Sequence, residues 1–192
     1  MRRLITLSVF FFTIIFCNAQ AVTDTVPVNI AAINEDSSIL SKTLIFADST
    51  SALSVSDVLT QSFSPLILSR YRKKVTPERI TNSFYLKFLV SNDSEKEKSA
   101  YLYVGPRYKE ITLYKIGGGL QSIKNADSIA GYRKFTLAAG EKCYILAVLE
   151  PLKSEFGGIT PILINRDFIS FYKNFLIGHK NDLQIFGLIL SG

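Results

Sequence analysis

The chain has 192 residues, of which 47% are hydrophobic and 20% are charged, and its formal net charge is +6. This length suits one domain of ordinary size together with targeting segments, and it argues against a second core. Loss of Arg2 and Arg3 with an expected signal peptide would leave a charge of +4, which does not indicate a nucleic-acid-binding surface.

Residues 1–19 have the pattern of a secretory signal peptide. Met1-Arg2-Arg3 is basic, Leu4 to Phe16 is apolar and uncharged, and Cys17-Asn18-Ala19 precedes a cleavage site before Gln20. The apolar run is too short to span a bilayer comfortably. The alternative, lipidation of Cys17, needs a small residue before the cysteine, and Phe16 is bulky. The sequence therefore predicts export.

Removal of residues 1–19 would leave Cys143 as the only cysteine, so the domain cannot form an internal disulfide and must be held by its core. Cys143 opens a continuous apolar run that extends to Leu149. This context predicts a buried residue of an inner strand in preference to a reactive nucleophile.

Before the central strands, residues 20–37 are expected to form a linker or an edge strand, because Pro27 and the Asn34-Glu35-Asp36 cluster interrupt the apolar positions. Residues 42–47 predict a strand. Ser54 and Asp57 have the spacing of a capping box, with Asp in place of the usual Glu, and predict a short helix over residues 55–62.

A basic stretch follows from Leu66 to Arg79, with cationic residues at Arg70, Arg72, Lys73, Lys74 and Arg79. We interpret it as a solvated loop that leads into the central strand. The alternative is a patch that contacts an anionic ligand or acidic lipid.

The remaining chain shows period-two apolar runs separated by turn residues, which is typical of antiparallel strands. Gly117-Gly118-Gly119 is expected at a hairpin tip, and Pro161 favours an edge position for the last run. The sequence thus predicts a mainly β protein, an antiparallel β-sandwich or jelly roll over residues 38–172. The expected strands cover residues 84–90, 101–104, 111–114, 131–137, 143–149 and 159–164, with a further strand over 167–172.

Candidate ligand-binding residues are tyrosines, since aromatic rings on a sheet face can stack on sugar rings. Tyr101 and Tyr103 share one face of a strand, and Tyr114 ends the next expected strand. Tyr132 and Arg133 follow the glycine-rich hairpin and are expected to reach the same surface. The alternative is that these tyrosines are simply good strand residues whose hydroxyl groups reach water.

No catalytic or metal-binding motif is evident, and we expect neither enzymatic activity nor a cofactor. His179 is the only histidine, and no Ser or Cys can be paired with it by spacing. The acidic residues are scattered, without a His/Cys cluster. Carboxylate pairs for glycoside hydrolysis could be assembled by chance in any sandwich, here from Glu110, Asp127, Glu141 or Glu155.

The order of these features resembles a known receptor family. The order is Ser54 to Leu59, Phe63, a basic loop, Ser83-Phe84-Tyr85-Leu86-Lys87-Phe88 with Asn92, Ile111 to Tyr114, Gly131 with Arg133, and Ala139-Gly140-Glu141. It is similar to the extracellular type 2 sensor domain of bacterial seven-transmembrane receptors with diverse intracellular signalling modules, over about residues 38–171. The family usually has tryptophan where Tyr85 stands and arginine where Lys87 stands. The resemblance implies a jelly roll that senses carbohydrate-like small molecules.

The C-terminal residues 173–192 are expected to form a helix. Leu183 to Gly192 is apolar and uncharged but shorter than the about 20 residues that a spanning helix needs. It is interpreted as the start of a truncated first transmembrane helix; the alternative is a short helix that packs on the domain. The resemblance implies a sensory input domain at the periplasmic or extracellular face of the inner membrane. Here it is expected as a fragment without its output parts. The alternative function is a free secreted or envelope-associated binding module, and the oligomeric state stays open.

Overall fold

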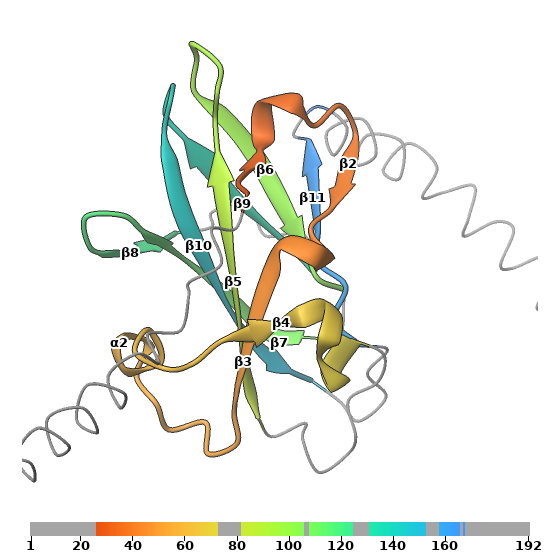
Figure 1. Ribbon diagram of the computed structural model, residues 1–192, viewed down its shortest axis with the longest axis vertical. Coiled ribbons are helices and arrows are strands. Elements are labelled where there is room, and N and C mark those ends of the chain that lie inside the picture. The colour runs from red at the N-terminus through yellow and green to blue at the C-terminus, as the bar shows by residue number, and fades with distance from the viewer. Residues whose placement is uncertain are drawn as a thin grey trace, which may run out of the picture.

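The computed structural model describes residues 26–72, 82–105, 108–124, 131–152, 158–165 and 167 (Figure 1). The expected signal peptide, the expected C-terminal helix and strand 167–172, and His179 lie outside these ranges, apart from residue 167 itself. The described chain is mainly β, with two sheets, one short α-helix and four 3-10 helices.

The larger sheet, called sheet A, has the strand order β4-β3-β5-β10-β7-β8, with β1 paired to β5. Its pairings are antiparallel except for the parallel pair of β1 and β5. The apolar strand β10 lies between β5 and β7, as its sequence predicts. The bounds are β1 Val28–Asn29, β3 Thr43–Asp48, β4 Ser64–Pro65, β5 Ser83–Ser91, β7 Tyr108–Ile116, β8 Leu120–Ile123 and β10 Lys142–Pro151.

The smaller sheet, called sheet B, has four strands in the order β2-β11-β6-β9, all antiparallel. The bounds are β2 Asp36–Ser38, β6 Lys98–Tyr103, β9 Tyr132–Leu137 and β11 Ile162–Asn165.

The inner faces of the two sheets meet in a single core. Alternate residues of β5 supply it from sheet A, with Phe84 and Phe88 at most 1% exposed. Sheet B supplies Leu102, Phe135 and Leu163 in the same way. Because successive strand residues point to opposite faces, this one set of apolar positions binds the two sheets together as a sandwich.

The outer face of sheet A is covered by α2 (Val55–Val58). Ser54 caps this helix as predicted, since its hydroxyl accepts the backbone N–H of Asp57 at 3.2 Å. Val58 is fully buried and belongs to a cluster with Tyr85 and Leu146. The helix ends earlier than the expected Ser62.

The early end of α2 has a local cause. The hydroxyl of Thr60 donates to the carbonyl of Asp57 at 2.7 Å, and the backbone N–H of Thr60 bonds to the same carbonyl. Side-chain bonds of this kind compete with helical hydrogen bonds and favour a turn.

Two sequence predictions about the strands were wrong. The last strand, β11, is not an edge strand but lies between β2 and β6, because Pro161 precedes the strand and therefore interrupts no ladder bond. The strand that ends at Tyr114 was expected beside the strand of Tyr101 and Tyr103, yet β6 belongs to sheet B and β7 belongs to sheet A. In addition, β8 was not expected.

Residues 26–42 form a segment that crosses from sheet A to sheet B, shown in orange-red in Figure 1. It runs through β1, the 3-10 helix η1 (Ile30–Ala32), β2 and the 3-10 helix η2 (Leu40–Lys42). Asn165 at the end of β11 holds it, with its backbone N–H bonded to the Glu35 carbonyl and its side chain to the Ile33 carbonyl, both at 2.8 Å. The sandwich thus extends N-terminal to the expected boundary at residue 38.

Candidate functional site

Two of the predicted tyrosines face each other across sheet B. Tyr103 on β6 lies opposite Tyr132 on β9, with ring centroids 4.5 Å apart and 31° between the ring planes. Both side chains are half-buried, and Ile162 on β11 flanks Tyr103 on its other side. They lie on the outer face, because the neighbouring Leu102 points into the core. The sheet therefore presents a paired aromatic surface on rigid strands.

Tyr101 shares this outer face but is largely used in packing. It is only 7% exposed and forms a cluster with Ile164, its partner on β11. A change of Tyr101 to Ala would remove buried contacts, so it would lower stability as well as any binding. Tyr103 and Tyr132 are thus the better test of the predicted surface.

Tyr114 does not belong to this surface. It lies on β7 in sheet A, opposite Leu146, and packs with the cluster under α2 on the other outer face of the sandwich. The prediction that it stands beside the strand of Tyr103 was wrong, because β6 belongs to sheet B and β7 belongs to sheet A.

Arg133 also departs from the predicted surface. It is paired with Leu102, so it points to the inner side of β9, opposite to its neighbour Tyr132. Its Nε donates to the Ile111 carbonyl of sheet A at 2.8 Å, and its Nη1 donates to the Tyr132 carbonyl at 2.8 Å. Arg133 therefore links the two sheets at their edge.

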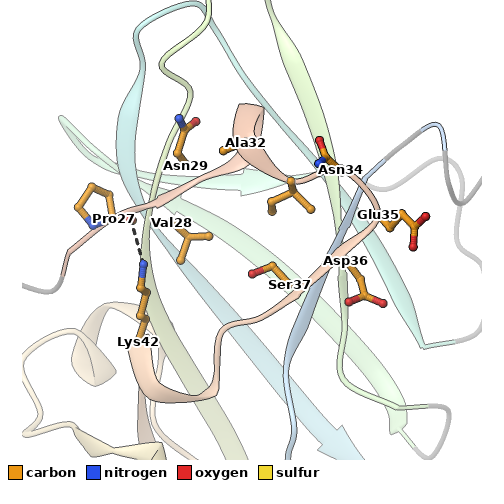
Figure 2. Close-up of a pocket in the computed structure, with 10 residues that line it drawn as sticks. Pro27, Val28, Asn29, Ala32, Asn34, Glu35, Asp36, Ser37 and Lys42 are labelled. Carbon is orange, nitrogen blue, oxygen red and sulfur yellow. Dashed lines mark hydrogen bonds between the residues drawn. The ribbon is translucent and has the colours of Figure 1, made fainter.

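A concave pocket of about 690 Å³ lies along the N-terminal segment (Figure 2). Val28 and Ile33 belong to the core, so the pocket adjoins the core. The ammonium of Lys42 donates to the Pro27 carbonyl at 3.5 Å, the dashed line in Figure 2. The lining residues are Pro27, Val28, Asn29, Ala32, Ile33, Asn34, Glu35, Asp36, Ser37 and Lys42.

The pocket has mixed chemistry. In Figure 2, Ser37 lies across from Val28, whereas the carboxylates of Glu35 and Asp36 point away from them. The volume is in the range of small-molecule sites, which combine apolar surface with a few polar groups. The sequence interpretation missed these residues, because it treated residues 20–37 as a linker or edge strand. The signal that could have indicated them is the recurrence of apolar core positions at Val28, Ile30 and Ile33 within that stretch.

Cys143 and Glu141, which were considered from the sequence as candidates for catalysis, are used in packing and in an ion pair. Cys143 is buried, and burial together with the Glu141 carboxylate raises the pKa of its thiol to about 11, although Lys115 opposes this shift. The prediction of a buried strand residue is confirmed. Glu110 lies on β7, whereas the Glu141 carboxylate is paired with Lys115 at 2.8 Å. Asp127 and Glu155 lie outside the described residues.

Within the described ranges, no group of three or more His, Cys, Asp or Glu side chains is placed to hold a metal ion. The helices in these ranges are all too short or too polar to cross a membrane. No known family model matches the chain, and no curated protein matches it.

Proposed function

We propose that the chain is the exported ligand-sensing input domain of a bacterial membrane signalling receptor. In this proposal it binds a carbohydrate-like small molecule. The signal-peptide pattern of residues 1–19 and the apolar C-terminal stretch support this location. The order of sequence features that resembles type 2 sensor domains supports the receptor class.

We further propose a jelly-roll-like arrangement for the sandwich. Apart from the hairpin of β7 and β8 within sheet A, the strands from β5 to β10 alternate between the sheets, since β5, β7, β8 and β10 belong to sheet A while β6 and β9 belong to sheet B. Such alternation between two packed sheets is in keeping with a jelly roll.

The observation that carries ligand binding is the pair formed by Tyr103 and Tyr132. A sugar ring has an apolar C–H face and polar edges, so it suits an aromatic ring with a polar hydroxyl at its tip. Backbone pairing of β6 and β9 fixes the two rings relative to each other, which lowers the ordering cost on binding.

Binding can be tested by titrating the chain with mono- and oligosaccharides while following tyrosine fluorescence. The chain contains 9 tyrosines and no tryptophan, so the tyrosine signal is unmasked. We expect Tyr103→Ala and Tyr132→Ala each to weaken binding by roughly tenfold, a typical loss for an aromatic contact. Tyr114→Ala on the opposite outer face is the matched control and should leave affinity unchanged.

Two results would contradict this assignment. Equal losses in the Tyr103, Tyr132 and Tyr114 variants would mean that general destabilisation is being measured. Unchanged affinity in folded Tyr103 and Tyr132 variants would move the ligand elsewhere. Ser37→Phe, which inserts a ring into the pocket of the N-terminal segment, then tests that pocket as the location.

The receptor part of the proposal is tested by membrane partitioning of the chain with and without residues 183–192, once cleavage before Gln20 is established. If the full chain partitions and the trimmed chain is soluble and folded, the tail is the start of a membrane helix. If trimming unfolds a chain that was soluble throughout, the tail belongs to the core. The free secreted or envelope-associated module is then the better account.

A further inference from the structure

The 3-10 helix η3 (Leu66–Leu68) exposes apolar side chains at one end of the sandwich. Leu68 is 83% exposed and Ile67 is 40% exposed. They are among the few large hydrophobic side chains that the described chain leaves in water. Because the two side chains are neighbours on one short helix, they form a small exposed apolar patch and are not isolated exposed residues.

The backbone around these side chains is firmly anchored. Leu66 is fully buried in the core, and Tyr71 of the next 3-10 helix, η4 (Arg70–Arg72), packs edge-on against Phe84 with ring centroids 4.8 Å apart. The Tyr71 carbonyl accepts the backbone N–H of Ile159 at 3.0 Å. Because Leu66 and Tyr71 are fixed on either side, the side chains of Ile67 and Leu68 are held outward and cannot fold back onto the domain.

Two arginines accompany the apolar side chains. Arg70 and Arg72 are exposed, and they lie within four residues of Leu68. The Arg70 guanidinium is 5.3 Å from the Tyr71 ring centroid, and Arg72 Nη1 donates to the Ile67 carbonyl at 3.4 Å.

We propose that the surface formed by Ile67, Leu68, Arg70 and Arg72 contacts an anionic phospholipid bilayer. Exposed leucines can enter the boundary between headgroups and acyl chains while arginines bind the phosphates. Neither a neutral surface nor a basic partner would suit the two cations. The inference goes beyond ligand sensing, since it states how the domain is oriented on the membrane.

The test uses a local reporter, because apolar residues elsewhere in the full chain could bring it to vesicles by themselves. The chain has no tryptophan, so Leu68→Trp introduces a single indole at the proposed contact. With vesicles that contain phosphatidylglycerol, we expect a blue shift of its emission and quenching by brominated acyl chains. Leu120→Trp is the control, since Leu120 is 40% exposed on β8, at the opposite end of sheet A.

The charge requirement is tested in the Leu68→Trp background. Arg70→Gln with Arg72→Gln should weaken partitioning of the indole into anionic vesicles by roughly thirtyfold, since each cation near the surface contributes about fivefold. Lys98→Gln with Lys142→Gln removes two exposed cations at the other end and should change little.

Three outcomes would overturn the proposal: an indole at position 68 that stays in water on bound vesicles, equal responses at positions 68 and 120, or equal effects of the two charge variants. A response at position 68 to a protein partner but not to lipid would also overturn it. A chain that passes these tests yet binds no sugar keeps this inference and loses the proposed ligand.

Discussion

At the residue scale, Gly131 controls how closely the two loops beside the tyrosine pair approach. Its φ is +81°, and a Cβ at this position would lie 2.6 Å from the Gly105 carbonyl oxygen and 3.2 Å from Cε2 of Tyr103. Only glycine fits without moving the backbone after β6. Gly131 therefore links loop packing to the position of a candidate ligand-binding ring.

We predict that Gly131→Ala lowers the free energy of unfolding by about 3 kcal/mol, since it combines backbone strain with overlap. It should also weaken binding at Tyr103. Gly140→Ala is the matched control, because Gly140 has a φ of +67° but no atom within 4 Å of an added Cβ. That variant should lose only about 1 kcal/mol in urea unfolding. Equal losses would show that the overlap is relieved without cost.

Glu141 gives the fold a dependence on pH. Partial burial by itself would raise the pKa of Glu141, but hydrogen bonds from Lys115 and from the Ala138 N–H, with the charge of Lys115, hold the pKa below its ordinary value. Because the pKa is lowered in the folded state, the carboxylate stabilises the fold above the unfolded-state pKa. This contribution is lost as the pH falls through the folded-state pKa.

We predict that Glu141→Gln lowers the free energy of unfolding at neutral pH by about 1 kcal/mol, the usual size for a partly exposed pair with hydrogen bonds. The difference from the unchanged chain should shrink below about pH 4, where the unfolded carboxyl is protonated. Urea unfolding between neutral and acidic pH measures this. If the difference in free energy of unfolding between the two chains stayed constant with pH, the side-chain shape of Glu141 and not its charge would be responsible for the stabilisation.

At the element scale, α2 shows how a helix of four residues can be stable. A helix this short is not stable alone, so capping and burial must hold it. Its cap is Ser54, and its buried contact is Val58 against Tyr85 and Leu146. The stability of α2 therefore depends on its packing against sheet A, and α2 in turn shields Tyr85 and Leu146 of that sheet from water.

We predict that Val58→Ala lowers the free energy of unfolding by about 2 kcal/mol, because it leaves a cavity between α2 and the sheet. Ser56→Ala, at an exposed position of the same helix, should change it by less than about 0.5 kcal/mol. Thermal or urea unfolding distinguishes the two. A small loss at Val58 would indicate that α2 moves in to fill the cavity.

The sequence predicted local elements better than their partners. Alternation in Phe84, Leu86 and Phe88 was enough to place β5, because a one-residue shift would turn the charged Lys87 into the core. The pairing of β6 with β11 joins residues that are about 60 positions apart in the chain, for example Tyr101 with Ile164. No local pattern encodes such a pairing, and for this reason the edge assignment of β11 failed.

The same limit explains what was and was not predictable in the candidate site. Tyr101 and Tyr103 could be placed on one face from their spacing, and Tyr132 joined them by register. Arg133 could have been separated from Tyr132 by the same alternation, since neighbours on a strand point to opposite faces. Tyr114 could not, because its face depends on which sheet β7 joins.

At the scale of the whole molecule, a buried polar side chain connects strand ends and turns that belong to different sheets. Asn92 is fully buried after β5, and its amide donates to the carbonyls of Lys96, Leu137 and Ala138 at 2.8 to 3.1 Å. It thus joins the end of a sheet A strand to the turn that follows β9. The sequence showed Asn92 only as the end of a strand.

The position of β11 has a consequence for how the chain folds during synthesis. β2 pairs Asp36 with Ile164, and β11 is its one strand partner among the described residues, so this pairing must wait until nearly the whole domain has been made. Until then β6 also lacks the neighbour that covers one of its edges. Folding of sheet B is therefore slow and late. The chain must lose the entropy of closing a long loop before the stabilising contacts between its distant strands can form. During that interval both strands offer open edges to other chains, which makes the unfinished domain most prone to aggregation just before it is complete.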